Sequence, residues 1–387
     1  MPDLEPPDPP AAHAARQSHR PGLPPGPLAG LVVADLSTVL AGPYCTMLLA
    51  DLGAEVVKVE PPEGDATRGW GPPWVAPGRL GPDDPGTAAY YLAVNRNKRS
   101  IRLDLRRPEA LEALRRLIAR SDVLVENFRV GGLERLGFDD AALLALNPRL
   151  VHLAITGFGP DGPDAERPGY DFAVQAMAGL MSITGFPDAE GGHPTKVGVA
   201  IADVVTGLHG AVAILAAVAR QARSGEAQAE AHGEARGEEP GGARGEEQGG
   251  AAPSDGQRID VSILESTLAV LVNQAQNAFV TGRAPVRRGN VHPNIVPYET
   301  FATADGEIAV AVGSERQWPR FCEALGLGEL AGDRRFRTNG DRVERHAELA
   351  AVLAARFRQE TSSAWLERLG AAGVPCAPIN DVLAAFG

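Results

Sequence analysis

The chain is poor in cysteine and in aromatic residues. Its 387 residues contain three cysteines, Cys45, Cys322 and Cys376, at wide spacing and without a C-x-x-C pair. This count excludes a disulfide-stapled scaffold and the familiar cysteine-based zinc modules. It is typical of a reducing compartment, so we expect a cytoplasmic protein. Aromatic residues make up only 5 %, whereas 45 glycines and 32 prolines predict frequent turns.

Long apolar runs and excess positive charge are also lacking. No stretch reaches the ~18 apolar residues of a membrane helix. The longest candidate, residues 204–219, is interrupted by His209 and by threonine and glycine residues, and the first residues contain no apolar core of a signal peptide. The net charge of −12 argues against non-specific binding to nucleic acid. We therefore expect neither a membrane nor a nucleic acid as a partner.

Motifs for metal binding and for serine hydrolysis are absent as well. The eight histidines form no H-E-x-x-H pattern and no cluster with the cysteines, so no metal site is predicted. No G-x-S-x-G is present, which removes support for a serine-hydrolase elbow.

Two segments have a composition that does not build a core. Residues 1–27 contain nine prolines and are expected to be a disordered extension. Residues 225–255 contain no Val, Ile, Leu, Phe, Tyr or Trp, and hold eight acidic residues against two arginines. We interpret them as a solvated, loop-like insertion of low complexity.

Between these segments, residues 28–224 alternate between strand and helix patterns. Short apolar runs predict strands at 31–36, 54–60, 100–105, 122–126 and 150–156, and helical periodicity predicts helices at 41–52, 108–119 and from about 203 onward. Such alternation is typical of a parallel sheet flanked by helices. The fold class is therefore α/β.

The pattern changes after the insertion. Residues 256–283 are expected to form a helical linker, with a helix at about 261–279. Residues 298–304 and 307–313 resemble a hairpin around Asp305-Gly306, and helices are predicted at 317–325 and 342–359. Residues 284–387 are thus expected to form a smaller α+β domain.

The sequence GFGPDG at 157–162 matches the G-x-G-x-x-G pattern of dinucleotide-binding folds and follows a predicted strand. That pattern requires a helix to begin at the glycines. Here Pro160, Pro163 and Pro168 follow, and a proline inside a helix costs about 3 kcal/mol. A proline-rich turn over the sheet edge is the better interpretation.

Two further features each allow a structural and a functional interpretation. The basic run at 95–100, followed by Arg102, Arg106 and Arg107, suits a polyphosphate ligand or a solvated surface with intrachain ion pairs. Asp203, at the start of a predicted helix, suits either a helix cap or a functional carboxylate beside backbone amides that could receive an oxyanion.

These signals come together in one resemblance, to the class III CoA-transferases. It covers residues 28–384 apart from the 225–255 insertion. The matching segments are DLSTVLAGP (35–43), LGAEVVKVE (52–60), GDATR (64–68), NRNKRS (95–100), VENFR (125–129), GYD (169–171), GVAIAD (198–203), PYETF (297–301) and GVPCAPI (373–379).

The resemblance implies a Rossmann-like large domain with a small domain, in an interlocked homodimer. It places the catalytic aspartate at Asp203, with acyl-CoA and a carboxylic acid as substrates and no metal or redox cofactor. By the same resemblance, the residues expected to contact CoA are Val39, Leu40, Ala41, Leu103, Asp104, Arg106, Asn127, Phe128, Arg129, Arg135, Tyr170 and Asp171.

Within this family, the expected activity is CoA transfer through an aspartyl anhydride and an aspartyl-CoA thioester. The segments at 169–185 and 289–301 are most similar to succinyl-CoA:dicarboxylate CoA-transferases. The family also contains α-methylacyl-CoA racemases, which place a histidine where this chain has Tyr170; a tyrosine, which ionises only near pH ~10, is a poor acid/base for proton exchange.

A non-catalytic CoA-binding protein is the remaining alternative. Relatives usually continue past the position of Gly387, so a C-terminal segment that returns to the large domain is expected to be absent here.

Overall fold

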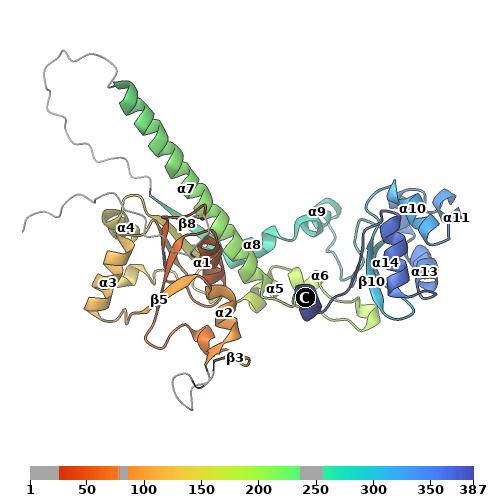
Figure 1. Cartoon of the computed structure of the whole chain (residues 1–387), viewed down its shortest axis with the longest axis horizontal. Helices are drawn as coiled ribbons and strands as arrows, with labels where there is room; N and C mark the ends of the chain where they lie inside the picture. The colour runs from red at the N-terminus through yellow and green to blue at the C-terminus, as the bar shows by residue number, and fades with distance from the viewer. Residues whose placement is uncertain (1–25, 77, 79–85, 236–255) are drawn as a thin grey trace, which may run out of the picture. The chain divides into compact units, whose positions relative to one another are not determined.

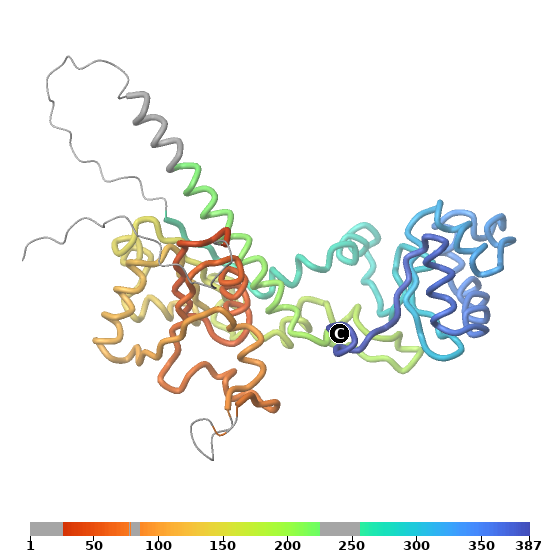
Figure 2. Tube along the Cα trace, in the orientation of Figure 1, coloured from red at the N-terminus to blue at the C-terminus, as the bar shows by residue number. Residues whose placement is uncertain are grey.

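The computed structural model describes residues 26–76, 78, 86–235 and 256–387, and the side chains of 225–235 are not described. The described residues belong to two compact units (Figures 1 and 2). The large unit lies within Met1–Leu180 and Val197–Gln276, and the small unit within Met181–Lys196 and Asn277–Gly387. The expected extension at 1–27, except for its last two residues, and residues 236–255 of the expected insertion lie outside the described residues.

A six-stranded parallel sheet forms the centre of the large unit. The strand order is β5-β2-β1-β6-β7-β8, and Val33 of β1 pairs with Val56 of β2 on one side and Val123 of β6 on the other. The parallel sheet confirms the α/β prediction. The strands are β1 (Val32–Asp35), β2 (Glu55–Glu60), β5 (Lys98–Arg102), β6 (Val123–Glu126), β7 (Val151–Thr156) and β8 (Gln257–Ser262).

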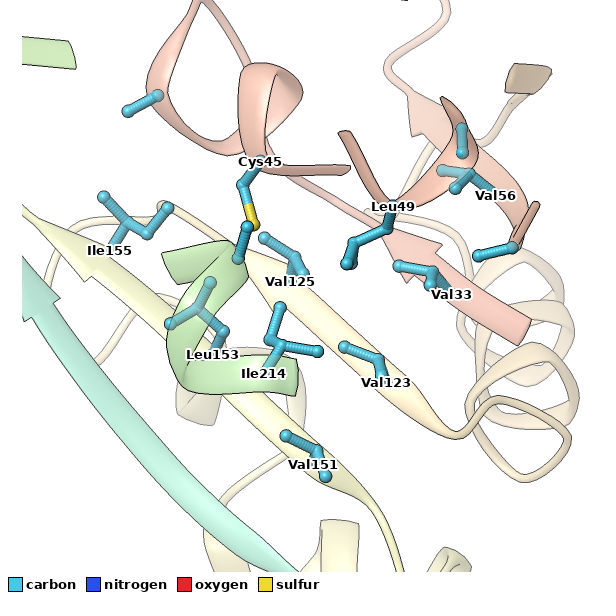
Figure 3. Packing of buried hydrophobic residues seen from close by; sticks show 14 of the residues in the cluster. Val33, Cys45, Leu49, Val56, Val123, Val125, Val151, Leu153, Ile155 and Ile214 are labelled. Atoms are coloured by element: carbon cyan, nitrogen blue, oxygen red, sulfur yellow. The ribbon is translucent and has the colours of Figure 1, made fainter. Parts of the chain in front are cut away.

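One face of this sheet is covered by α1 (Ala41–Asp51), α7 (Ile201–Ala235) and α8 (Ile263–Ala269). Cys45 and Leu49 of α1 and Ile214 of α7 meet the strand valines there (Figure 3), and burying each large side chain contributes roughly 1.5–3 kcal/mol. Helices α1 and α7 approach closely at Gly207 of α7. A Cβ at this position would lie 2.6 Å from the carbonyl oxygen of Ala41, so the absence of a side chain permits the approach. The other face packs against α3 (Pro108–Ile118) and α4 (Asp140–Leu146).

Helix α7 is longer and more apolar than the sequence suggested. The segment Ile201–Ser224 has the length and hydropathy of a membrane helix, contrary to our expectation that no stretch reaches that limit. Its side chains at Ala202, Ile214 and Ala217 are buried in the core of the large unit. The apolar face of α7 therefore packs against the sheet.

Three other expectations need correction. Residues 257–262, expected within a helical linker, form the edge strand β8, and the helical part divides into α8 and α9 (Val272–Thr281). Alternation of side chains along β8 and its pairing with β7 outweigh the helical pattern at this edge. Helix α7 continues to Ala235, into the segment expected to be a loop, and the predicted helix at 342–359 divides at Arg345.

The small unit contains a three-stranded antiparallel sheet in the order β11-β10-β9. The predicted hairpin is confirmed by β9 (Tyr298–Ala302) and β10 (Glu307–Ala311), which pair with each other; β10 also pairs with β11 (Cys376–Pro378). Phe301 stacks on Phe357 at 4.4 Å between ring centroids in the core. The helices over this sheet are α10 (Gln317–Ala324), α11 (Glu329–Gly332), α12 (Asn339–Glu344), α13 (His346–Phe357) and α14 (Ser362–Ala371).

The remaining elements are short. They are the strands β3 (Trp74–Val75) and β4 (Thr87–Ala88), the helices α2 (Ala89–Asn95), α5 (Asp171–Met177), α6 (Leu180–Ile183) and α15 (Val382–Phe386), and the 3-10 helices η1 (Ala66–Gly69), η2 (Glu134–Leu136) and η3 (Asp188–Glu190).

Candidate active site

A cavity lies at the edge of the sheet where the parallel strands end. The chain builds the sheet outward from β1 through β2 to β5, and then returns to the other side of β1 with β6. This reversal leaves a crevice between the loops that follow β1 and β6, the usual ligand position in an open α/β sheet. The fold thus provides a site before any particular side chain is considered.

Hydrogen bonds join the two loops across this crevice. The Thr38 backbone amide donates to Oδ1 of Asn127 and the Asn127 side-chain amide donates to the Thr38 carbonyl, both at 2.9 Å. Val39 follows with φ of +70°, a backbone conformation that is an outlier for a β-branched residue. The wall of the cavity is therefore a braced loop in an unusual conformation.

The cavity has a volume of about 220 Å3 and lies entirely within the large unit. It brings together predicted residues that are far apart in the sequence, although their roles stay predictions. The predicted residues that line it are Val39, Leu40, Ala41, Asn127, Phe128, Arg129, Tyr170 and Asp203.

Other predicted CoA contacts do not line the cavity. Leu103, Asp104 and Arg106 follow β5 at the far edge of the sheet, and the Arg106 guanidinium donates to Oδ1 of Asp104 at 2.7 Å. Arg135 lies in η2. Their expected contacts with CoA stay predictions.

The basic run at 95–102 favours the surface interpretation. Arg96 pairs with Asp51, Arg99 pairs with Glu55 at 3.0 Å, and Arg102 donates to the Pro62 carbonyl. The side chain of Lys98 is buried. Intrachain partners therefore occupy much of the run that could have bound a polyphosphate.

Asp203 is a buried carboxylic acid in the first turn of α7. The residue is 9 % exposed and lines the cavity, and no side chain or amide among the described residues donates a hydrogen bond to its carboxylate. Burial, together with the nearby charge of Asp171, raises the pKa of Asp203 from 3.8 to about 7. The protonated and the ionised form therefore coexist near neutral pH, and the ionised form is the one that a carboxylate nucleophile requires.

The cap at the start of α7 is provided by Asp171 and not by Asp203. The helix begins at Ile201, so Asp203 already lies within its first turn. Oδ1 of Asp171 accepts a hydrogen bond from the Ala202 amide at 2.8 Å, and Oδ2 accepts one from the Gln175 side chain at 2.8 Å. Oδ1 of Asp171 therefore caps the helix that carries Asp203, while Oδ2 is bonded within α5.

The turn over the end of β7 is not a dinucleotide site. No helix begins at Gly157; the next helix is α5, which starts at Asp171. A Cβ at Gly157 would lie 2.6 Å from the Cα of Gly169, so the glycines let the turn at 168–170 approach the strand end closely. The turn then presents Tyr170, which is 63 % exposed, to the cavity.

Tyr90 of α2 is not among the site residues expected from the sequence. Its hydroxyl pKa is raised by burial and by the charges of Asp203 and Asp171, and its ring packs against the cluster of Leu40, Met47 and Val94. Its sequence context, a helical run of alanine, tyrosine and leucine, carries no signal that separates it from an ordinary core residue. Thr38, Ile155, Thr156, Arg167 and Ile263 are further lining residues that the sequence did not indicate.

Potential metal ligands are scattered in the part of the chain that the structure describes. No group of three or more His, Cys, Asp or Glu side chains is arranged there to hold a metal ion. The three cysteines are free thiols, and burial raises the pKa of Cys45, which makes it a core residue and not a nucleophile.

Comparison with known proteins identifies the family of this chain. The family model for CoA-transferase family III matches residues 28–230 and 246–386, and its gap falls inside the low-complexity segment. Succinate–glutarate CoA-transferase from Agrobacterium fabrum is 43 % identical over 93 % of this chain and 82 % of its own length. Human succinyl-CoA:glutarate CoA-transferase is 38 % identical over 93 % and 73 %, respectively.

Solved structures of similar proteins share the fold of this chain. A CAIB/BAIF family protein from Brucella suis has a TM-score of 0.74 and 43 % identity, with 94 % of this chain and 86 % of that chain covered. A protein from Mycobacterium tuberculosis has a TM-score of 0.75 at 29 % identity, with the same coverage. The chain therefore belongs to the class III CoA-transferases, enzymes that transfer CoA between an acyl-CoA and a carboxylate.

Proposed function

We propose that this enzyme transfers CoA from a dicarboxylyl-CoA, such as succinyl-CoA, to a free dicarboxylic acid, with Asp203 as the acyl carrier. Three relatives support the substrate class, since succinate, glutarate and mesaconate occur in their names. The observation that carries the mechanism is the burial of one carboxylate, Asp203, in the wall of the cavity at the switch point of the sheet.

The proposed reaction proceeds through two exchanges at Asp203. Its carboxylate attacks the thioester carbonyl, forms a mixed anhydride and releases the CoA thiolate. The thiolate then attacks the aspartyl carbonyl, which gives an aspartyl-CoA thioester and releases the donor acid as a carboxylate. The acceptor carboxylate reverses both steps, so that Asp203 is regenerated and the new acyl-CoA leaves.

A carboxylate suits this chemistry because an anhydride and a thioester are both energy-rich. The bond energy of the donor is therefore retained through every step, whereas a serine ester would lose it. Both intermediates hydrolyse readily, so the site has to exclude water. The low exposure of Asp203 supports this requirement.

The neighbours of Asp203 support a carrier role. Ionised Asp203 receives no hydrogen bond from a described residue, and burial disfavours its charge, so attack on a carbonyl removes a poorly stabilised anion. The exposed ring of Tyr170 at the cavity favours a contact with the acyl group. Proton exchange by a racemase would need a second acid/base at this position, and a tyrosine is poorly suited to it.

The test is a carboxylate panel with matched variants at residue 203. Wild-type enzyme with succinyl-CoA and glutarate should yield glutaryl-CoA by mass spectrometry. Asp203→Asn, which keeps the size but not the nucleophile, should reduce kcat by at least about 1000-fold. Asp203→Ala with undiminished turnover would eliminate the carrier mechanism, and α-deuterium exchange into a 2-methylacyl-CoA would favour the racemase instead.

We also propose a homodimer. Val272, Phe279 and Val280 of the single helix α9 are 71 %, 80 % and 75 % exposed. Large apolar side chains gathered on one helix and left exposed are typical of an interface. Light scattering on the purified chain should give twice the monomer mass of 40.5 kDa; a monomer at micromolar concentration would contradict the proposal.

The remaining details of the proposal concern compartment and cofactors. Free thiols at Cys45, Cys322 and Cys376 fit a reducing compartment, and we propose the cytoplasm. CoA enters as a substrate, and we propose that the enzyme uses no resident cofactor, because every step above is carried by a carboxylate or a thiolate. Fractionation of cells and assay after chelation test these two points.

A further inference from the structure

The loop between β1 and α1 has a conformation that its own sequence does not favour. Val39 has φ of +70°, and a β-branched residue there is strained by about 1–3 kcal/mol. Such strain persists only where the surroundings determine the backbone more strongly than the local preference. The contacts of this loop therefore show what fixes the wall of the cavity.

Lys58 of β2 donates a hydrogen bond to the loop between β1 and α1. Its side chain is 0 % exposed, and its ammonium donates to the Ser37 carbonyl at 2.7 Å and pairs with Oδ2 of Asp65 at 3.0 Å. The Ser37 amide in turn donates to Oδ1 of Asp35 at 3.0 Å. Both backbone groups of the residue two positions before Val39 are thus fixed by buried charges.

A second lysine fixes the other end of the loop. The Lys98 ammonium donates to the Pro43 carbonyl, in the first turn of α1, at 2.8 Å and to Oδ2 of Asp35 at 3.1 Å. Burial raises the pKa of a carboxyl, but Lys98 and Lys58 outweigh it and lower the pKa of Asp35 to about 2. Asp35 is therefore a permanent anion between two lysines, and each lysine binds one end of the loop.

Stability alone does not explain these buried charges. Desolvating an ion pair costs several kcal/mol, and a well-packed apolar replacement is often as stable or more so. What an apolar pair cannot supply is a donor for the Ser37 carbonyl. We propose that Lys58 is a positioning residue for CoA transfer, which holds the loop at 37–41 in the backbone conformation that forms the acyl-CoA binding wall.

The inference rests on the proposed function of the cavity, and one pair of variants isolates it. Asp65→Asn removes the ion pair but leaves the bond from Lys58 to Ser37. The double variant Lys58→Met/Asp65→Asn also removes that bond without leaving an unpaired buried carboxylate. Comparing the two separates the positioning effect from the loss of the ion pair.

We expect Asp65→Asn to keep the wild-type KM for acyl-CoA. The double variant should raise that KM by about 10–100-fold, the usual value of a hydrogen bond to a charged group, with a smaller change in kcat. Equal KM values for the two variants would overturn the inference. A wild-type enzyme without transferase activity would instead refute the proposed function, which keeps the two failures apart.

A second variant decides the matter if the double variant does not fold. A Cβ at Gly42 would lie 2.2 Å from the Cβ of Ser37, so Gly42→Ala displaces the same loop without removing a buried charge. The KM for acyl-CoA should rise in this variant as well. A folded Gly42→Ala enzyme with an unchanged KM would show that the loop conformation does not set acyl-CoA affinity.

Discussion

Asp203→Asn should stabilise the enzyme at the same time as it abolishes activity. The pKa of Asp203 rises from 3.8 to about 7 on folding, first because of burial and then because of Asp171. Each pKa unit corresponds to ~1.4 kcal/mol, so ionised Asp203 reduces the free energy of unfolding at pH 8 by at most ~4 kcal/mol. Asparagine keeps the shape of the side chain without this cost.

The sign of the effect depends on pH. A folded-state pKa above the unfolded value means that the native state binds the proton more tightly, so wild-type stability falls as pH rises from about 4 to about 7. Asp203→Asn should therefore gain about 1–4 kcal/mol over wild type at pH 8, and the gain should vanish near pH 4.

The assay is urea unfolding at pH 8 and pH 4.5, at one protein concentration, since a dimer makes the midpoint depend on concentration. Asp161→Asn is the matched control, because Asp161 is exposed and distant in sequence from the cavity residues of α7. A gain that is the same at both pH values, or no gain at pH 8, would refute the idea that Asp203 carries a destabilising charge.

Three other predictions follow from the same contacts. The value of kcat/KM should fall tenfold per pH unit below about pH 7, as Asp203 becomes protonated. The variant Asp171→Asn, which keeps an acceptor for the Ala202 amide, should shift this fall to lower pH. An unchanged pH profile would show that Asp171 does not act on Asp203. Gly207→Ala should destabilise the fold by about 1–3 kcal/mol in thermal unfolding because its Cβ meets the Ala41 carbonyl; an unchanged midpoint would mean that α7 can shift freely. Activity should survive EDTA treatment, and a loss that zinc or magnesium restores would contradict a metal-free mechanism.

Local periodicity predicted most of the large unit correctly. The strands at β1, β2, β6 and β7 and the helices α1 and α3 are short, strongly patterned segments, and the observed bounds differ from the predicted ones by at most one residue. The hairpin of β9 and β10 was equally clear because Asp305-Gly306 separates two extended runs. These elements are specified by neighbours in the sequence.

The errors occur where tertiary contacts outweigh the local pattern. Strand β8 was taken for helix because only its pairing with β7 shows that residues 257–262 are extended. Helix α7 begins two residues earlier than Asp203 because Asp171, distant in sequence, caps it. The gathering of Val39, Asn127, Tyr170 and Asp203 around one cavity was expected only through a family resemblance, since no spacing in the chain encodes the switch between β1 and β6.

Trapping the enzyme during turnover tests the central claim most directly. Hydroxylamine attacks anhydrides and thioesters, so enzyme incubated with succinyl-CoA and hydroxylamine should carry a hydroxamate on the peptide that contains Asp203, and only when acyl-CoA is present. A turning-over enzyme whose residue 203 is never modified, while product still forms, would contradict the carrier role of this side chain.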